Sequence, residues 1–430
     1  MIQGAQKPKT NVAAPNGKPS VLVLIPHYLP GYKAGGPISS LAAWVEMLGD
    51  EFQFKIVTSD RDLGDSVPFP DVRVGEWIPR GKAQVMYLPA GREAWRMLYR
   101  LLKTHSDCLL YINGLCPRRF SLFPVLLRRL RLIRPLQLIM APRGELHSGA
   151  LSCKPRRKSL FRSLSRLLSL YSDAIWHASC QQEEADIRAY LRPDRGRAVV
   201  FTASDLALQP AVVSVLKTPK RPGHLRVVYL GCISPAKNLF MALDVLRNVT
   251  GEVRFRIYGP IVDSEYWQTC TNAIEKLPAS IQVDYRGVVP HDSVYNILAE
   301  NDLFLLPTKG ENFGHVILEA LRAGCPVLTT DETPWGALTE EGAGWALPLN
   351  EPGWFTGTLQ ACVGMGHEEM RAMSERAVAF GFEHWPGRKD IEDNRRLLRH
   401  AFRRGHDATR GAEEAVSAGR QRRAEHTHGR

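Results

Sequence analysis

The sequence predicts an α/β protein built from two doubly wound, Rossmann-like domains. Short apolar runs alternate with helical patterns twice. The predicted strands of the first series are 21–26, 54–58, 83–89, 108–113, 136–142, 174–179 and 198–201, and those of the second are 225–231, 253–259, 281–287, 302–307 and 326–330. Nearly continuous apolar strands separated by helices are typical of parallel sheets that are covered on both faces. The length of 430 residues also suits two domains. Ligands of such sheets bind outside the carboxyl ends of the strands, so we expect function in the loops that follow the strands.

The chain divides into two predicted domains, one helix and two tails. A linker, SVLKTPKRPGH, separates the two series of strands. The first residues are polar and lack the apolar segment of a signal peptide, so we expect a disordered tail there. The predicted segments are a tail at 1–19, an N-terminal domain at 20–213, a C-terminal domain at 214–384, a helix at 385–404 and a basic disordered tail at 405–430.

Composition excludes several classes of protein. The hydrophobic fraction of 44% and the charged fraction of 23% are ordinary for a soluble globular chain. Eight cysteines without a C-x-x-C pair indicate neither a disulfide framework nor a zinc ribbon, and favour a reducing cytosol. No apolar run approaches the roughly 18 residues of a membrane-spanning helix. Asp60 and Asp62 form an Asp-x-Asp sequence after a strand, where aspartate is an ordinary turn residue, so no metal site is expected.

Positive charge is concentrated in residues 91–170. This segment contains 17 Lys and Arg residues and three acidic residues, an excess larger than the net charge of +12 of the whole chain. Two predicted helical segments, 118–135 and 153–173, carry most of it. Residues 118–173 are therefore a candidate surface for an anionic membrane or an anionic acceptor. The alternative is a solvated basic face over a core-facing leucine stripe. The segment has no RNA- or DNA-binding motif, so nucleic acid is not an expected partner.

The strongest motif lies in residues 306–334, LPTKGENFGHVILEALRAGCPVLTTDETPW. A strand ends at its start, a loop carries Glu311, and a helix is predicted to begin near Gly314 and to end at Gly324. Glu319 lies inside this helix. The unpaired amides and the positive dipole end of the helix form an anion site that suits a diphosphate. A carboxylate beside that site can accept hydrogen bonds from the hydroxyls of a ribose or a hexose.

A second candidate phosphate group follows the first strand of the C-terminal domain. In the segment LGCISPAKNL a glycine turn leads to Lys237 just where a helix is predicted to begin. An ammonium group at that position can neutralise a β-phosphate. On its own Lys237 is better explained as a solvated lysine at the start of a helix.

The segment ENFGHVILE, with ALRAGCPV after it and LPT before it, resembles the E-x7-E motif of retaining glycosyltransferase family 4, the group 1 type with the GT-B fold. The resemblance implies that Glu311 and the backbone after it hold the donor sugar and phosphates, that Glu319 holds the nucleotide ribose, and that Lys237 contacts the diphosphate. The family form of the Lys237 loop also has an arginine, whose place is taken here by Cys232. The implied donor site is Lys237, Glu311, Asn312, Phe313, Gly314 and Glu319.

The resemblance also assigns residues of the facing domain. Gly35 and Gly36 follow the first strand and resemble the glycine loop that approaches the donor, although they do not form a dinucleotide-binding G-x-G-x-x-G. The family often has a histidine in the loop APRGELHSG. The matching residue here is Arg143, with His147 four positions later, and Arg143 could stabilise charge on the leaving group or the acceptor. The catalytic candidates are thus Glu311, which would orient the hexose, and Arg143. The C-terminal helix is expected to cross back to the first domain, so that the two domains face a cleft.

By the same resemblance, the protein is a retaining hexosyltransferase that needs no cofactor. Its donor would be a nucleotide diphosphate sugar and its acceptor a glycan or a polyprenyl-diphosphate-linked oligosaccharide, in exopolysaccharide, capsule or lipopolysaccharide biosynthesis. Its place would be the cytoplasm, with peripheral association at the cytosolic membrane face. Two alternatives stay open: a non-catalytic nucleotide-sugar-binding partner subunit, which Cys232 favours, and a GT-B sugar-nucleotide epimerase. The base, the hexose, the acceptor, the linkage and the oligomeric state stay open as well.

Overall fold

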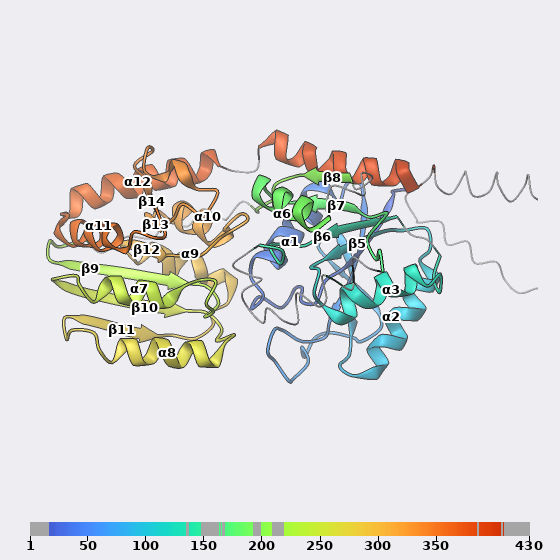
Figure 1. The fold of residues 1–430 in the computed structure, drawn as a ribbon, viewed down its shortest axis with the longest axis horizontal. Coiled ribbons are helices and arrows are strands. Elements are labelled where there is room, and N and C mark those ends of the chain that lie inside the picture. Colours follow the sequence, from blue (N-terminus) through green and yellow to red (C-terminus); the bar gives the residue numbers. More distant parts are fainter. Residues whose placement is uncertain are drawn as a thin grey trace, which may run out of the picture.

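The computed structural model contains two parallel sheets, each covered by helices (Figure 1). It describes residues 17–134, 137–147, 163, 165, 168–191, 199–208, 219–384, 387–405 and 407. Almost all of the two predicted tails, part of the predicted linker and most of the predicted basic helix 153–173 lie outside these residues. No helix in the described ranges is both long and apolar enough to cross a membrane.

The first sheet has eight strands in the order β3-β4-β2-β1-β5-β6-β7-β8. All neighbours are parallel except β3 and β4. The central strands are buried on both faces, as their apolar runs predict. The strands are β1 (Ser20–Leu24), β2 (Gln53–Ser59), β3 (Trp77–Arg80), β4 (Ala83–Leu88), β5 (Leu109–Asn113), β6 (Leu138–Ala141), β7 (Ile175–Ala178) and β8 (Val199–Thr202).

Helices pack on both faces of this sheet and close a separate hydrophobic core on each face. The predicted helix 118–135 is wrong in its extent. A π-helix covers Arg118–Leu122, α3 (Phe123–Arg129) follows with Pro124 in its first turn, and Arg131 ends the helical path with a φ of 58°. In the described part of this domain the other helices are α1 (Gly36–Leu48), α2 (Arg92–Thr104) and α6 (Gln181–Leu191).

The second sheet has six parallel strands in the order β11-β10-β9-β12-β13-β14. The chain builds one half of the sheet outward from β9 and the other half outward from β12. These two strands therefore flank the topological switch point, where ligands of doubly wound sheets bind. The strands are β9 (His224–Leu230), β10 (Glu252–Tyr258), β11 (Ile281–Tyr285), β12 (Leu303–Leu306), β13 (Val327–Thr330) and β14 (Gly344–Leu347).

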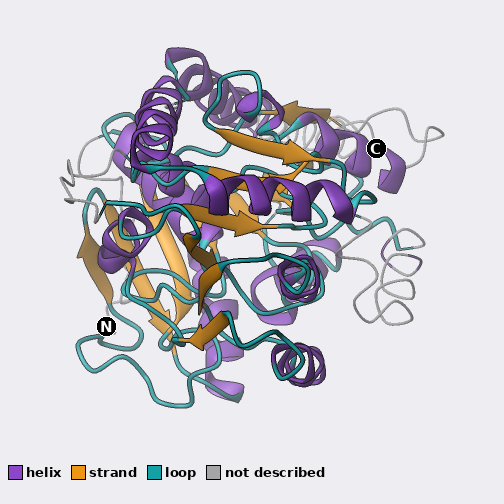
Figure 2. Cartoon of the chain, turned by 90° about the vertical axis from the view of Figure 1, so that its left-hand side faces the viewer, coloured by secondary structure: helices purple, strands orange, loops and turns teal. Residues whose placement is uncertain are grey.

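The helices of the second domain lie on both sides of its strands (Figure 2). The predicted helix of the E-x7-E motif is α10 (His315–Arg322), one residue later at its start than expected. Gly324, with a φ of 67°, follows its C-cap, and the amides of Gly324 and Cys325 donate to the carbonyls of Leu321 and Ala320. The other helices are α7 (Leu239–Leu246), α8 (Ser264–Ile274), α9 (His291–Ala299), α11 (Pro352–Gly364) and α12 (His367–Glu383), with a short 3-10 turn at Gly336–Leu338.

The helix at 388–405 leaves the second domain and lies across the first (Figure 1). Asn394 is fully buried there: its side-chain oxygen accepts a hydrogen bond from the Trp44 indole at 2.6 Å, and its amide nitrogen donates to the Ser204 carbonyl at 2.9 Å. Leu397 and Leu398 join the core of the first domain. The predicted crossing of the C-terminal helix is therefore present.

Candidate functional site

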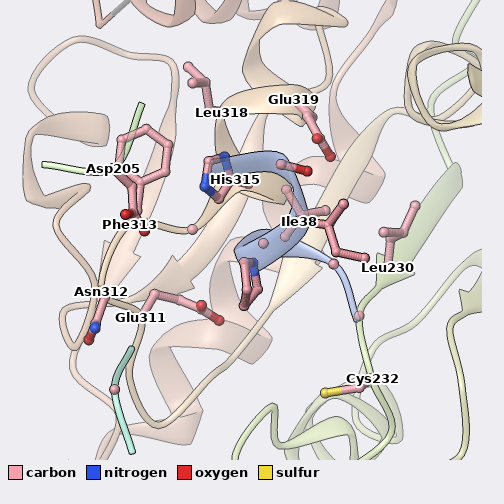
Figure 3. Close-up of a pocket in the computed structure, with 18 of the residues that line it drawn as sticks. Ile38, Asp205, Leu230, Cys232, Glu311, Asn312, Phe313, His315, Leu318 and Glu319 are labelled. Atoms are coloured by element: carbon pink, nitrogen blue, oxygen red, sulfur yellow. The ribbon is translucent and has the colours of Figure 1, made fainter. Parts of the chain in front are cut away.

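A cavity of about 960 Å³ lies between the two domains, where the loops after the strands of both sheets meet. Figure 3 shows residues from both domains converging on it. The structure brings every predicted site residue to this cavity, although they come from five separate loops and helices. They are Gly35, Gly36, Arg143, Lys237, Glu311, Asn312, Phe313, Gly314 and Glu319.

The N-terminus of α10 opens into the cavity. Its N-cap, Gly314, has a φ of 79°, and a β-carbon there would lie 3.1 Å from Ile317 and from the Trp335 ring. The Trp335 indole donates a hydrogen bond of 2.6 Å to the carbonyl of Phe313, which fixes the loop before the helix. The first amides of a helix have no intrahelical acceptor, so this end presents hydrogen-bond donors and a positive dipole to the cavity.

Lys237 and Glu311 form an ion pair across the cavity floor. Lys237 lies in the loop between β9 and α7, and Glu311 in the loop between β12 and α10. Burial disfavours the charge of Lys237, but the Glu311 carboxylate outweighs this effect and raises the lysine pKa. Lys237 therefore stays charged, and Glu311 is its ion-pair partner in the free protein. A bound diphosphate would compete with Glu311 for this ammonium group.

Glu319 is held largely in its neutral form. It lies on α10 with 14% of its side chain exposed, and His291 Nδ1 lies 3.8 Å from its Oε1. Burial raises the pKa of Glu319 to about 8, and the opposing effect of Arg322 is smaller. The Arg322 guanidinium is turned to backbone carbonyls, donating to Gly381 at 3.0 Å and to Leu208 at 3.2 Å. A carboxyl in this state can both donate and accept hydrogen bonds within the cavity.

Comparison with known proteins identifies the second domain. Residues 216–356 match the family described as glycosyl transferases group 1. The match covers the strands of the second domain, from β9 to β14. The curated sulfoquinovosyl transferase SQD2 of Arabidopsis thaliana is 28% identical over 110 residues, a match that spans 26% of this chain and 19% of that protein. The predicted likeness to group 1 glycosyltransferases is thereby confirmed for this segment, while the narrower assignment to family 4 stays a prediction.

Solved structures extend the likeness to both domains. HepE of Anabaena, in complex with UDP and glucose, has a TM-score of 0.61 and 15% identity over 89% of this chain and 98% of its own. Sucrose-phosphate synthase of Thermosynechococcus elongatus has a TM-score of 0.65 and 15% identity over 90% and 99%. WaaG, a glycosyltransferase of lipopolysaccharide biosynthesis, has a TM-score of 0.57 and 13% identity over 84% and 95%. At these identities the likeness shows the fold, and the predicted GT-B architecture is confirmed.

Arg143 contributes a fixed positive charge to the interdomain cavity. Its guanidinium donates to Asn113 and to the Tyr111 hydroxyl, each at 2.8 Å, and pairs with Asp205. Burial alone would lower its pKa, but Asp205 and the neighbouring groups outweigh burial and raise it. The residue lines the cavity with a φ of 56°. Groups of the first domain therefore already bind most of its guanidinium nitrogens.

Two histidines lie at the contact between the domains, and neither was assigned a role from the sequence: His147 was named without an assignment, and His315 was not singled out. His315 begins α10, and its Nε2 lies 2.7 Å from Ser40 Oγ of α1. Burial lowers the pKa of His315 to about 4, so the ring is neutral. His147 pairs through Nδ1 with Asp186 at 3.3 Å, and its ring leaves no room for a side chain at Gly310. His315 could have been found as the residue after the predicted helix cap, whereas Ser40 belongs to no motif.

The glycine loop of the first domain is anchored by Asp62. The Asp62 carboxylate accepts hydrogen bonds from the amides of Tyr32 and Lys33 at 2.8 and 3.1 Å. The Asp-x-Asp sequence thus has a structural role, as a brace for the loop that carries Gly35 and Gly36. A β-carbon at Gly36 would lie 3.3 Å from the His315 ring, so this glycine lets the two domains approach each other.

Proposed function

We propose that this protein is a retaining hexosyltransferase that moves a hexose from a nucleotide diphosphate sugar to a hydroxyl of a glycan or a lipid-linked oligosaccharide. The observation that carries the proposal is the interdomain cavity into which α10, Lys237, Glu311 and Glu319 all project. A helix dipole, an ammonium group and two carboxyl groups match the diphosphate, ribose and hexose of such a donor.

In the proposed complex the diphosphate lies between the N-terminus of α10 and Lys237. Glu319 binds the ribose hydroxyls, and Glu311 with the backbone of 312–314 orients the hexose toward the first domain. The bond from the anomeric carbon to the phosphate oxygen breaks with its electron pair on the diphosphate, and the acceptor oxygen bonds to that carbon on the same face. The acceptor proton passes to the departing diphosphate. The cationic and dipolar groups that bind the diphosphate also stabilise the charge it gains in the transition state.

The first domain would supply the acceptor side of the reaction. The backbone at Gly35 and Gly36 and the fixed positive charge of Arg143 face the donor groups across the cavity. Arg143 would act on the departing or accepting oxygen through its charge, because its network with Asp205 holds it in place before substrate arrives. Closure of the domains over the donor would exclude water and suppress its hydrolysis.

The first donor to test is a UDP-sugar. HepE, which shares this fold, has been solved with UDP-glucose. WaaG acts in lipopolysaccharide biosynthesis, and this supports a polysaccharide or lipid-linked acceptor here. An exposed cluster after α3 supports a peripheral position at an anionic membrane, since two leucines stand among cations there, with 65% and 51% of their surfaces exposed. This cluster consists of Arg129, Leu130, Arg131, Leu132 and Arg134.

A non-catalytic donor-binding subunit is the second candidate, and Cys232 favours it. Cys232 lines the cavity where the group 1 pattern has an arginine, and its Sγ contacts Ser234 Oγ at 3.7 Å. A thiol in this place removes one cation from the diphosphate site. Such a subunit would bind the donor and release no free nucleotide diphosphate in the presence of any acceptor.

The decisive experiment is a thermal-shift panel of UDP-, GDP- and ADP-sugars, followed by an assay of nucleotide diphosphate release with lipid-linked acceptors. A donor at 100 times its Kd should stabilise the protein by about 2.7 kcal/mol. Stabilisation by one donor and acceptor-dependent release of its nucleotide would support the transferase. Stabilisation without release would favour the subunit, and release that is independent of acceptor would favour donor hydrolysis or epimerisation. A flat response to every donor would reject the proposal.

A further inference from the structure

The cations of the cavity differ in what already neutralises them. Lys33 pairs with Asp65 at 2.5 Å, Arg143 pairs with Asp205, and Lys237 pairs with Glu311. Arg322 is turned to backbone carbonyls. Among the described residues that line the cavity, the remaining lysine or arginine is Lys309, which is exposed. Across the ranges that the structure describes, no carboxylate lies within ion-pair distance of it.

Lys309 is also held beside the predicted phosphate loop. Its backbone amide donates a hydrogen bond of 2.8 Å to the carbonyl of Ala236, the residue before Lys237. The Thr308 hydroxyl donates to the same carbonyl at 3.2 Å. These bonds tie the loop after β12 to the loop after β9, on the two strands that flank the switch point. The two lysines therefore project from adjoining backbone segments into one cavity.

The charge of a diphosphate requires more than the groups already assigned to it. Each of its two phosphate groups carries a negative charge, whereas Lys237 is shared with Glu311 and Cys232 brings no charge. We infer that Lys309 is a second cation of the diphosphate site, contacting the phosphate that Lys237 leaves less neutralised; this inference rests on the proposed function. A lysine suits the position because its long flexible stem can reach a phosphate from an exposed backbone.

The test compares nucleotide binding by calorimetry in the full chain and three variants. The probes are UDP, GDP and ADP, and the best of them on the wild type is used throughout. Lys309→Met should weaken its binding roughly tenfold or more, the effect of one charge-assisted contact. Lys276→Met is the matched control: it removes an exposed lysine of the same domain that does not line the cavity, and it should bind as the wild type does.

The third variant separates a phosphate role from a structural one. In Lys309→Met/Cys232→Arg a cation returns from the neighbouring loop, and binding should recover most of the lost affinity. Unchanged affinity in Lys309→Met would overturn the inference and leave the donor site standing. An equal loss in Lys276→Met, or no recovery in the double variant, would also overturn it. If the wild type binds none of the three diphosphates, the donor site itself fails and this inference fails with it.

Discussion

Replacing Glu319 by Gln tests the most unusual group in the cavity. The folded protein raises the pKa of this carboxyl from its ordinary value of 4.5 to about 8, chiefly through burial. Between these two values the folded protein keeps the proton that the unfolded chain has lost. Stability must therefore fall as the pH rises through this window, because the unfolded state releases a proton there and the folded state does not. Glutamine has the shape of the protonated carboxyl and does not titrate.

The size of the effect follows from the pKa. Each pH unit in the window costs about 1.4 kcal/mol of unfolding free energy. Across the interval from 4.5 to about 8 this amounts to roughly 5 kcal/mol if the site stays closed to water, and water entry reduces it. As the pH rises from 5 to 8, the wild type should lose at least roughly 2 kcal/mol of unfolding free energy relative to Glu319→Gln. For a domain of this size the difference corresponds to roughly 4–8 °C in Tm.

Differential scanning calorimetry at pH 5, 6, 7 and 8 measures this difference, on the donor-free protein and for the transition of the second domain. Glu340→Gln is the control, because Glu340 is exposed on the same domain. Parallel Tm profiles of the wild type and Glu319→Gln would refute the reasoning. The same samples report on the donor: if ionised Glu319 accepts the ribose hydroxyls, wild-type affinity for the nucleotide rises with pH toward 8, and Glu319→Gln binds weakly at every pH.

Three other substitutions have defined outcomes. Glu311→Gln releases Lys237 from its ion pair, so calorimetry should show nucleoside diphosphate binding several-fold tighter, roughly 1 kcal/mol, while sugar transfer falls; weaker binding would contradict the pairing. Gly310→Ala places a β-carbon 2.8 Å from the ring of His147 and so pushes the two domains apart at the cavity. We expect kcat/KM to drop roughly tenfold with the circular dichroism spectrum unchanged, and full activity would show that the domain contact accommodates the extra methyl group. Asn394→Ala removes the hydrogen bonds that join the crossing helix to Trp44 and Ser204, and urea unfolding should show the first domain destabilised by roughly 2–3 kcal/mol; an unchanged midpoint would show that apolar packing alone docks the helix.

The sequence predicted best the strands that are buried along their whole length. All five residues of β5 are buried, so a continuous apolar run was enough to identify it. The edge strand β3 was missed because it is half-exposed, pairs antiparallel and contains Pro79, which breaks the pattern of a buried parallel strand. The helix predicted at 118–135 failed for a related reason. Its apolar spacing continues past Arg129, but local backbone geometry at Arg131 stops the helix.

In the site, the elements formed by consecutive residues could be predicted, whereas the contacts between residues far apart in the sequence could not. The E-x7-E segment predicted a strand, a loop and a helix within some 20 consecutive residues, and each forms close to its expected place. The partners of the site residues come from far along the chain. Glu311 is 74 residues from Lys237, and Arg143 is 62 residues from Asp205. No spacing rule links such pairs, so the residues could be predicted while their charge balance could not.

That charge balance explains how recognition of the phosphates and of the sugar would be coupled. In the free protein Lys237 and Glu311 form an ion pair, so a ligand must break this pair to bind either side chain. A diphosphate that draws the ammonium group away leaves the carboxylate without its partner, next to the hexose hydroxyls that it would bind. A nucleoside diphosphate without a sugar provides a new partner for Lys237 but none for Glu311. Release of the bare diphosphate after transfer is then favoured by the same ion pair, because Glu311 competes for Lys237 once the hexose has left.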